Sequence, residues 1–243
     1  MKILAIDTTA QTAAAALTED DRPIGVYAQN GTMTHSETML NMVENVLKNA
    51  QTDIADVDMF AVSAGPGSFT GVRIGVSVIK GLAFAKGKPC VPVSTLEALA
   101  ENLHPLAAVT GTFYACPVMD ARRNQLYNAL FRYETDGEGN TVLVRLTEDR
   151  MIAAKALEAE LAELTLPVIF VGEGCRVTER EIHLPQAKEA PYALRFQSGY
   201  SVAVTAKRIY DAAEDKSAFT DLVLKPSYLR PSQAEREKNG DFS

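Results

Sequence analysis

Hydrophobic and polar positions follow two different periods in the first half of the chain. Short apolar runs separated by polar turns predict strands, and apolar positions three or four apart predict helices. A capping-box pattern, Thr34 with Glu37, marks the start of the first helix. The expected elements are strands at 3–6, 13–17 and 24–27, a helix at 35–49, a strand ending at Gly65, a helix reaching Ala85, a strand at 91–93 and a helix ending before Pro105.

The second half shows the same order of three strands, a helix and a strand, which suggests a structural duplication without sequence identity. The expected elements are strands at 114–119, 126–133 and 142–144, a helix at 151–164, a strand at 167–171, a tight turn at 172–174, a helix at 198–213 and an extended end at 225–230. We therefore expect an α/β protein with one domain at 1–107, a second at 108–231 and a polar, disordered tail at 232–243.

Composition narrows the class of protein. The chain has 243 residues, of which 47% are hydrophobic, so it can bury a substantial core. A net charge of −7 argues against strong binding to a phosphate backbone, and contact with nucleic acid is expected only through a partner. Cys90, Cys116 and Cys175 have no metal-binding or disulfide spacing, and no apolar run is long enough for a membrane, so a cytoplasmic protein is expected.

The least ordinary stretch is the glycine-rich turn within 58–75. Gly65 and Gly67 permit positive φ and close backbone approach. Ser68 or Thr70 is expected to cap the following helix, whose free N–H groups would favour an anion.

The alternative is that the glycines only let the helix and the strand pack closely together. Gly71, Gly75 and Gly81 would then give the helix a thin face for another helix. The spacing matches neither the dinucleotide-binding fingerprint nor the P-loop, so neither function follows from it.

Three segments together resemble one known family: IDTT at 6–9, HSE at 35–37 and SAGPGSFTGVRIG at 63–75. The chain is similar to the TsaB (YeaZ) family. Further matches are PVSTL at 92–96, MDARR at 119–123 and YLR at 228–230, so the resemblance extends over residues 1–231.

The resemblance implies an actin-like ATPase fold of the sugar kinase, Hsp70 and actin superfamily, with two tandem ribonuclease H-like domains. It also implies a non-catalytic subunit in forming threonylcarbamoyladenosine at position 37 of tRNAs that read codons beginning with A. The implied partners are the catalytic paralogue TsaD and a small ATPase, TsaE, which use the metal and ATP. A homodimer is implied for the chain alone.

Metal binding and proteolysis are not expected of this chain. The paralogue is implied to bind its metal through two histidines four residues apart on a helix, whereas His35, His104 and His183 are far apart. No H-E-x-x-H motif, Ser/His/Asp order or activated cysteine is found. We therefore predict no catalytic residue, no metal ligand and no cofactor bound by this chain itself.

Two sets of site residues follow. The candidate nucleotide or anion-binding residues are Asp7, Thr8, Gly65, Gly67, Ser68 and Thr70, although Asp7 could equally cap its own turn. The candidate partner-interface residues are His35, Met39, Leu40, Val43, Gly71, Val72, Arg73, Gly75, Val76 and Ile79, with Met33 and Met42 nearby.

Each set has an alternative. The interface residues could instead fill the core of the chain itself, and Arg73 needs a partner such as Asp7, Glu37 or a group on another subunit. The rival function is an independent actin-like phosphotransferase that holds ATP at the turns 65–67 and 172–174. Asn41 and Val72 depart from the family pattern, where proline and leucine are expected.

Overall fold

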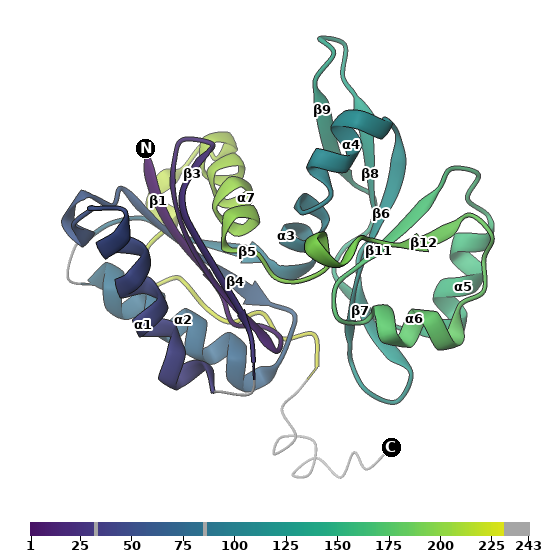
Figure 1. Cartoon of the computed structure of the whole chain (residues 1–243), viewed down its shortest axis with the longest axis horizontal. Coiled ribbons are helices and arrows are strands. Elements are labelled where there is room, and N and C mark those ends of the chain that lie inside the picture. The colour runs from purple at the N-terminus through teal and green to yellow at the C-terminus, as the bar shows by residue number, and fades with distance from the viewer. Residues whose placement is uncertain (32–33, 85–86, 231–243) are drawn as a thin grey trace.

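The computed structural model describes residues 1–31, 34–84 and 87–230, which form two sheets with helices around them (Figure 1). The first sheet has the order β3-β2-β1-β4-β5, with β4 and β5 parallel to β1 and with β2 antiparallel to both of its neighbours. Its strands are β1 (Lys2–Asp7), β2 (Thr12–Glu19), β3 (Arg22–Asn30), β4 (Met59–Gly65) and β5 (Cys90–Ser94).

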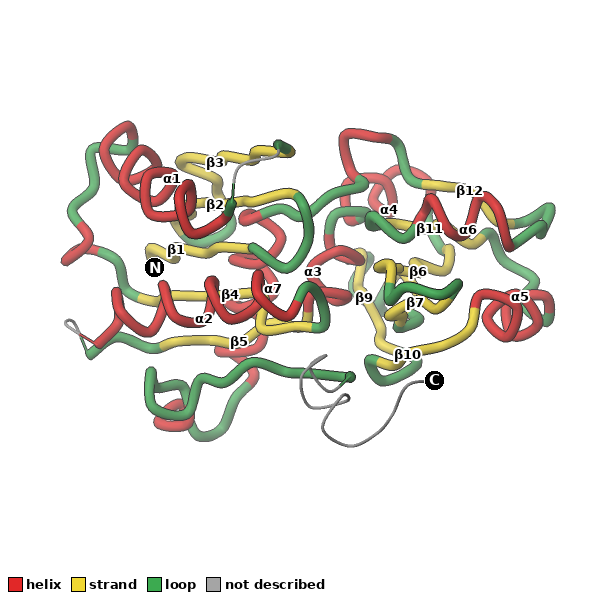
Figure 2. The backbone as a smooth tube through the Cα atoms, turned by 90° about the horizontal axis from the view of Figure 1, so that it is seen from below, coloured by secondary structure: helices red, strands yellow, loops and turns green. Residues whose placement is uncertain are grey.

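Helices cover both faces of this first sheet, with α2 (Phe69–Phe84) in front of the strands and α7 (Gly199–Ala212) behind them in Figure 2. Leu4 and Ile6 of β1 join the core beneath α1 (His35–Asn49) and α2. Ile3 and Ala5 point to the other face, where they join the core beneath α7. The alternation of side chains along a strand therefore divides the apolar run of β1 between two cores.

The second sheet is built on β6, which pairs with β7, β8 and β11. Its strands are β6 (Phe113–Asp120), β7 (Gln125–Asn128), β8 (Phe131–Thr135), β9 (Thr141–Arg145), β10 (Arg150–Ala153), β11 (Val168–Val171) and β12 (Ala187–Glu189). The helices α5 (Ala154–Ala162) and α6 (Cys175–Glu181) accompany it, and 3-10 turns lie at Ile54–Asp56, Tyr192–Leu194 and Lys216–Ala218.

The two halves exchange helices. Helix α3 (Thr95–Glu101) and α4 (His104–Thr110) follow the first sheet in sequence, yet Leu96 and Leu99 of α3 join the core of the second sheet. Conversely, α7 comes last in sequence and packs on the first sheet (Figure 1). The expected division at 107/108 assigns α7 to the second domain, whereas α7 packs on the first sheet.

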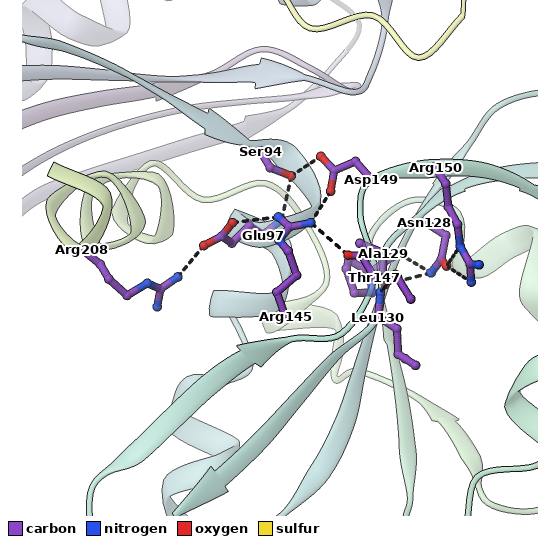
Figure 3. A network of polar contacts seen from close by, with 11 residues as sticks. Ser94, Glu97, Asn128, Ala129, Leu130, Arg145, Thr147, Asp149, Arg150 and Arg208 are labelled. Carbon is purple, nitrogen blue, oxygen red and sulfur yellow. Dashed lines mark hydrogen bonds and ion pairs between the residues drawn. The ribbon is translucent and has the colours of Figure 1, made fainter. Parts of the chain in front are cut away.

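Ion pairs hold this arrangement at the centre of the molecule (Figure 3). Arg145, at the end of strand β9, contacts Glu97 of α3 at 2.8 Å and Asp149 at 2.7 Å. Arg208 of α7 contacts Glu97 at 2.9 Å, so Glu97 bridges two arginines. Ser94 also donates a hydrogen bond to Asp149. Glu97 thus links α3 both to α7 and to strand β9 of the second sheet.

Most expected elements are found, with four differences. The expected helix at 151–164 starts as strand β10, since Met151 pairs with Tyr127 of β7. The expected strand at 126–133 is broken into β7 and β8. Pro105 lies in the first turn of α4, where a proline costs no hydrogen bond. Helix α6 and strand β12 were not expected.

Two expectations concern the chain outside these elements. The tail at 232–243, together with Met33 and the expected end of α2 at Ala85, lies outside the described residues. Among the helices that are described, none is long and apolar enough to cross a membrane.

Candidate functional site

The start of α2 is packed tightly against the turn that follows β1. A Cβ atom added to Gly71 would lie 2.0 Å from the carbonyl oxygen of Thr8, and one added to Gly67 would lie 2.5 Å from that of Thr9. The amide of Ser68 donates to the same Thr9 oxygen at 2.7 Å. The glycines therefore let α2 approach the turn after β1 closely. The structural alternative was right about close packing, but Gly71 and Gly75 face this turn instead of another helix, and no other part of the described chain lies within 4 Å of a Cβ added to Gly81.

Asp7 lies at the end of β1 and is only 1% exposed. Its Oδ1 accepts hydrogen bonds from the amide and hydroxyl of Thr9, and its Oδ2 accepts one from the hydroxyl of Ser63. Burial raises the pKa of this carboxyl, although those hydrogen bonds lower it in part. The Asp7 side chain is therefore engaged within the fold and caps its own turn.

The C-terminal segment covers the other side of the glycine turn. The amide of Ser227 donates to the carbonyl of Ala64 at 2.7 Å, and a Cβ on Gly65 would lie 2.1 Å from the Ser227 oxygen. Gly65 also has a φ of 125°, which favours glycine. Tyr228 stacks on Phe69 with ring centroids 4.6 Å apart. The glycine turn and the start of α2 are thus covered by the segment at 8–9 and by the segment at 227–228 of the same chain.

A cleft of about 440 Å³ lies between the halves beside this turn. From the first half, Gly67, Ser68 and Thr70 line it. From the second half, Asp120, Arg122 and Glu173 line it. Among the candidate anion-binding residues, Asp7, Thr8 and Gly65 are not part of this lining.

The second-half wall of this cleft has an unusual backbone. Arg122, Arg123 and Asn124 have φ values of 70°, 55° and 55°, a conformation that costs free energy for residues other than glycine. Burial raises the pKa of Glu173 on the neighbouring turn. Sequence reasoning identified the turn at 172–174, but it did not single out Glu173 as a cleft residue.

Of the two residues expected to cap helix α2, one does so. Helix α2 starts at Phe69, and the hydroxyl of Ser68 accepts from the amide of Gly71 at 3.4 Å. Ser68 therefore holds the capping position, and Thr70 lies within the first turn of the helix.

A second cavity, a groove of about 410 Å³, opens between the starts of α1 and α2. We call it the α1–α2 groove; it is lined by His35, Ser36, Met39, Leu40, Phe69, Thr70, Arg73, Ile74, Ser77 and Val78. Leu40 is 55% exposed on its rim. Arg73 is exposed and lies over the ring of Phe69, 5.3 Å from its centroid.

The α1–α2 groove contains a buried polar atom without a partner. The Nε2 atom of His35 lies 2.6 Å from the carbonyl oxygen of Ala10, so this nitrogen carries the proton and donates. The Nδ1 atom of His35 is then a free acceptor, and it has no partner among the described residues.

The structure divides the candidate partner-interface residues into two groups. His35, Leu40 and Arg73 reach the groove surface. Seven others are buried in the core of the chain: Met39, Val43, Gly71, Val72, Gly75, Val76 and Ile79. Six of these seven do not line the groove, because they pack against the first sheet or the Thr8 turn. Met39 is buried as well, but it also lines the groove. Ile74, Ser77 and Val78 were missed, although they lie on the opposite side of α2.

The described residues offer no obvious metal centre. No group of three His, Cys, Asp or Glu side chains is placed to hold a metal ion in the part of the chain that the structure describes. The three histidines lie apart. His104 of α4 lies beside Glu101 of α3, and His183 follows α6.

Comparison with known proteins shows which family this chain resembles. A family model described as "TsaD: tRNA N6-adenosine threonylcarbamoyltransferase" matches residues 8–238. The tRNA threonylcarbamoyladenosine biosynthesis protein TsaB of Bacillus subtilis is 34% identical over 71% of this chain and 71% of its own length. The Escherichia coli protein of the same name is 30% identical over 84% of this chain and 91% of its own length.

The solved structure of YeaZ from Pseudomonas aeruginosa has the same fold. Its TM-score is 0.73 at 24% identity, over 94% of this chain and 99% of that one. The expected α/β fold is thereby confirmed, and it is the fold of YeaZ. The chain belongs to the TsaB (YeaZ) family of tRNA threonylcarbamoyladenosine biosynthesis proteins.

Proposed function

We propose that this chain is a non-catalytic subunit that binds a TsaD-type transferase through the α1–α2 groove. In this role it supports formation of threonylcarbamoyladenosine at position 37 of tRNAs that read codons beginning with A. ATP and the metal are used by the partner subunits, a TsaE-type ATPase joins them, and tRNA is contacted through the complex. Alone, the chain forms a homodimer through the same groove.

The proposal rests on side chains of the α1–α2 groove that are exposed or unpaired within the described chain. Leu40 offers an exposed apolar side chain beside the unpaired acceptor of His35. Arg73 makes no ion pair with any described residue, and Asp7, one of its expected partners, is buried and hydrogen-bonded elsewhere. A partner with an apolar centre and a carboxylate for Arg73 would complete this surface.

The closed glycine turn supports the absence of phosphoryl-transfer chemistry in this chain. An actin-like ATPase needs an accessible carboxylate and free backbone near the phosphates. Here Asp7 is buried, and the oxygens of Thr8 and Thr9 lie against the glycines of α2. The independent phosphotransferase is therefore the weaker alternative, with only the 440 Å³ cleft in its favour.

Replacing Leu40 by aspartate tests the proposed interface. The Leu40→Asp variant should bind the purified TsaD-type paralogue at least about tenfold more weakly in calorimetry, because buried apolar anchors dominate interfaces. The matched control is Leu146→Asp, at a leucine that is 41% exposed in the second half. Both variants should keep the thermal midpoint of the parent, since neither side chain is buried.

Equal binding by Leu40→Asp and Leu146→Asp would contradict the proposed interface. A separate assay addresses the non-catalytic role: the pure chain is mixed with ATP and magnesium, and released phosphate is measured. Robust turnover without partners, abolished by Asp7→Asn, would establish the phosphotransferase instead. Val76 and Ile79 are unsuitable for charge substitutions, because both lie in the core.

A further inference from the structure

A larger cleft, of about 850 Å³, lies between the halves on the α7 side of the first sheet. We call it the α7 cleft. Its walls come from strand β3 with Val26 and Ala28, from strand β9, from helix α7 and from the segment at 193–198. Its volume falls within the range of about 300–1,000 Å³ that is usual for ligand pockets. The α1–α2 groove lies on the opposite face of the sheet, so the two sites are separate.

The α7 cleft is lined by a buried carboxamide without hydrogen bonds. Gln197 is 3% exposed, and neither its Oε1 nor its Nε2 has a partner among the described residues. The hydroxyl of Thr12, which also lines the cleft and is 3% exposed, is likewise unpaired. An unpaired buried polar group costs about 1–3 kcal/mol.

The neighbouring Asn102 shows what a satisfied amide looks like in this region. Its Nδ2 donates to the carbonyls of Leu194 and Phe196 at 3.0 and 2.7 Å, and its Oδ1 accepts from Ser201 at 2.6 Å. The amide of Gln197 thus differs from an adjacent amide that serves the fold. Its donor and acceptor have no partner among the described residues.

One wall of the α7 cleft is a strand edge. Strand β9 pairs only with β8 among the described strands, so its other edge is open. Thr141, Val142 and Leu143 all line the cleft. Because consecutive side chains of a strand point to opposite faces, three consecutive residues meet one cavity along the strand's edge. Unpaired N–H and C=O groups at such an edge can pair with another strand.

Apart from Asp21, which makes no ion pair with a described residue, the charged groups around the α7 cleft are already matched. Arg208 contacts Glu97 and Glu101 at 2.9 Å each, and Lys207 contacts Asp211 at 2.8 Å. Apolar side chains supply much of the remaining wall: Val26, Ala28, Leu143, Leu194, Phe196 and Val204. An anionic ligand would have to break the ion pairs of Lys207 and Arg208, whereas an uncharged one need not.

We propose that the α7 cleft binds an extended, uncharged peptide segment of another protein, which adds to the open edge of β9. In an extended chain the N–H and C=O of one residue point to the same side, and a carboxamide offers the matching acceptor and donor. Gln197 pairs with one such residue, and alternate apolar side chains of the segment contact Val26 and Ala28. Main-chain pairing gives affinity and the apolar wall selects side chains.

The probe is the blocked hexapeptide acetyl-Thr-Val-Thr-Val-Thr-Val-amide, titrated into the full chain by calorimetry and by amide NMR. Its matched partner is the same peptide with alternate backbone nitrogens methylated, which cannot donate to a strand. We expect the first peptide to bind with shifts at residues of β9, and the second to bind at least about tenfold more weakly.

Two variants locate the site. Gln197→Met keeps the volume of the side chain, so it should weaken peptide binding about tenfold while leaving the thermal midpoint equal or higher, because it removes unpaired buried polar atoms. Ala28→Arg should fill the cleft and abolish binding. Its control is Gln29→Arg, whose side chain lies on the other face of β3 and should leave binding within about twofold.

Several results would overturn the proposal. These are no binding of the peptide at millimolar concentration, equal binding of the methylated peptide, and equal loss in Ala28→Arg and Gln29→Arg. Binding of adenosine in place of the peptide would assign the Gln197 amide to a nucleobase instead. A large drop in the thermal midpoint of Gln197→Met would assign it to the fold. None of these outcomes depends on whether Leu40 binds the paralogue.

Discussion

The two faces of helix α2 show how one element can serve both the core and the surface. On the inner face, Gly71 and Gly75 let the helix pack so closely against Thr8 that an added methyl group would clash with it. On the outer face, Phe69 and Arg73 line the open α1–α2 groove. Both pairs have the four-residue spacing that places side chains on one side of a helix. The spacing is therefore the same on both faces. The two faces differ in side-chain size, because the glycines pack against Thr8 whereas Phe69 and Arg73 line the groove.

The largest effect is expected on the inner face, from Gly71→Ala. The new Cβ would lie 2.0 Å from a backbone oxygen that cannot rotate away. We expect a loss of at least about 3 kcal/mol in the free energy of unfolding, measured by urea denaturation. Gly75→Ala should cost less, about 1–2 kcal/mol, because its nearest neighbour at 2.5 Å is the side-chain oxygen of Thr8.

Gly81 is the control for both of these substitutions. It lies on the same helix with nothing within 4 Å of an added Cβ. Gly81→Ala should stabilise the protein by about 0.5–1 kcal/mol, since alanine has the higher helix propensity. If all three alanine variants behaved alike, the close contact between α2 and the Thr8 turn would be disproved.

An effect of intermediate size is expected at Asp7, through its dependence on pH. Burial raises the pKa of Asp7, so the folded chain keeps this proton at pH values where the unfolded chain has lost it. Stability from the protonated carboxyl is then present at low pH and is lost as the pH rises through the folded pKa. The parent should therefore lose stability relative to Asp7→Asn as the pH rises, in urea unfolding across a pH series. A difference that stays constant with pH would contradict this.

The smallest effect is expected on the outer face, from Arg73→Ala. The exposed stacking of Arg73 on Phe69 is worth less than about 1 kcal/mol, so the unfolding free energy should barely change. Binding of the paralogue should fall at the same time, because Arg73 is proposed to meet a carboxylate there. A loss of stability above about 2 kcal/mol would show that Arg73 supports the fold.

Local signals in the sequence predicted the local structure well. The capping box of Thr34 and Glu37 is formed, and α1 runs over the expected residues. The tight turn after Gly65 and the following helix are also found. These features depend on neighbouring residues, and neighbours in sequence are visible in a pattern.

What the sequence could not provide is the identity of long-range contacts. The glycines indicated a close approach, but nothing in the pattern named Thr8 or Ser227 as the atoms approached. An apolar stripe at Val72, Val76 and Ile79 looks the same whether it meets a sheet or a partner. For the same reason Gln197 passed unnoticed, since an amide is ordinary until its surroundings leave it unpaired.

The exchange of helices between the halves has a consequence for the protein during its synthesis. One face of the first sheet, with Ile3 and Ala5, is covered by Val202 and Ala206 of α7. A ribosome must therefore add about 200 residues before that face can be sealed, although all five of its strands are complete by Ser94. At a synthesis rate of about 5–20 residues per second, the face stays open for at least several seconds. While residues 95 to about 200 are being added, the nascent chain therefore exposes an apolar face of the kind that chaperones bind.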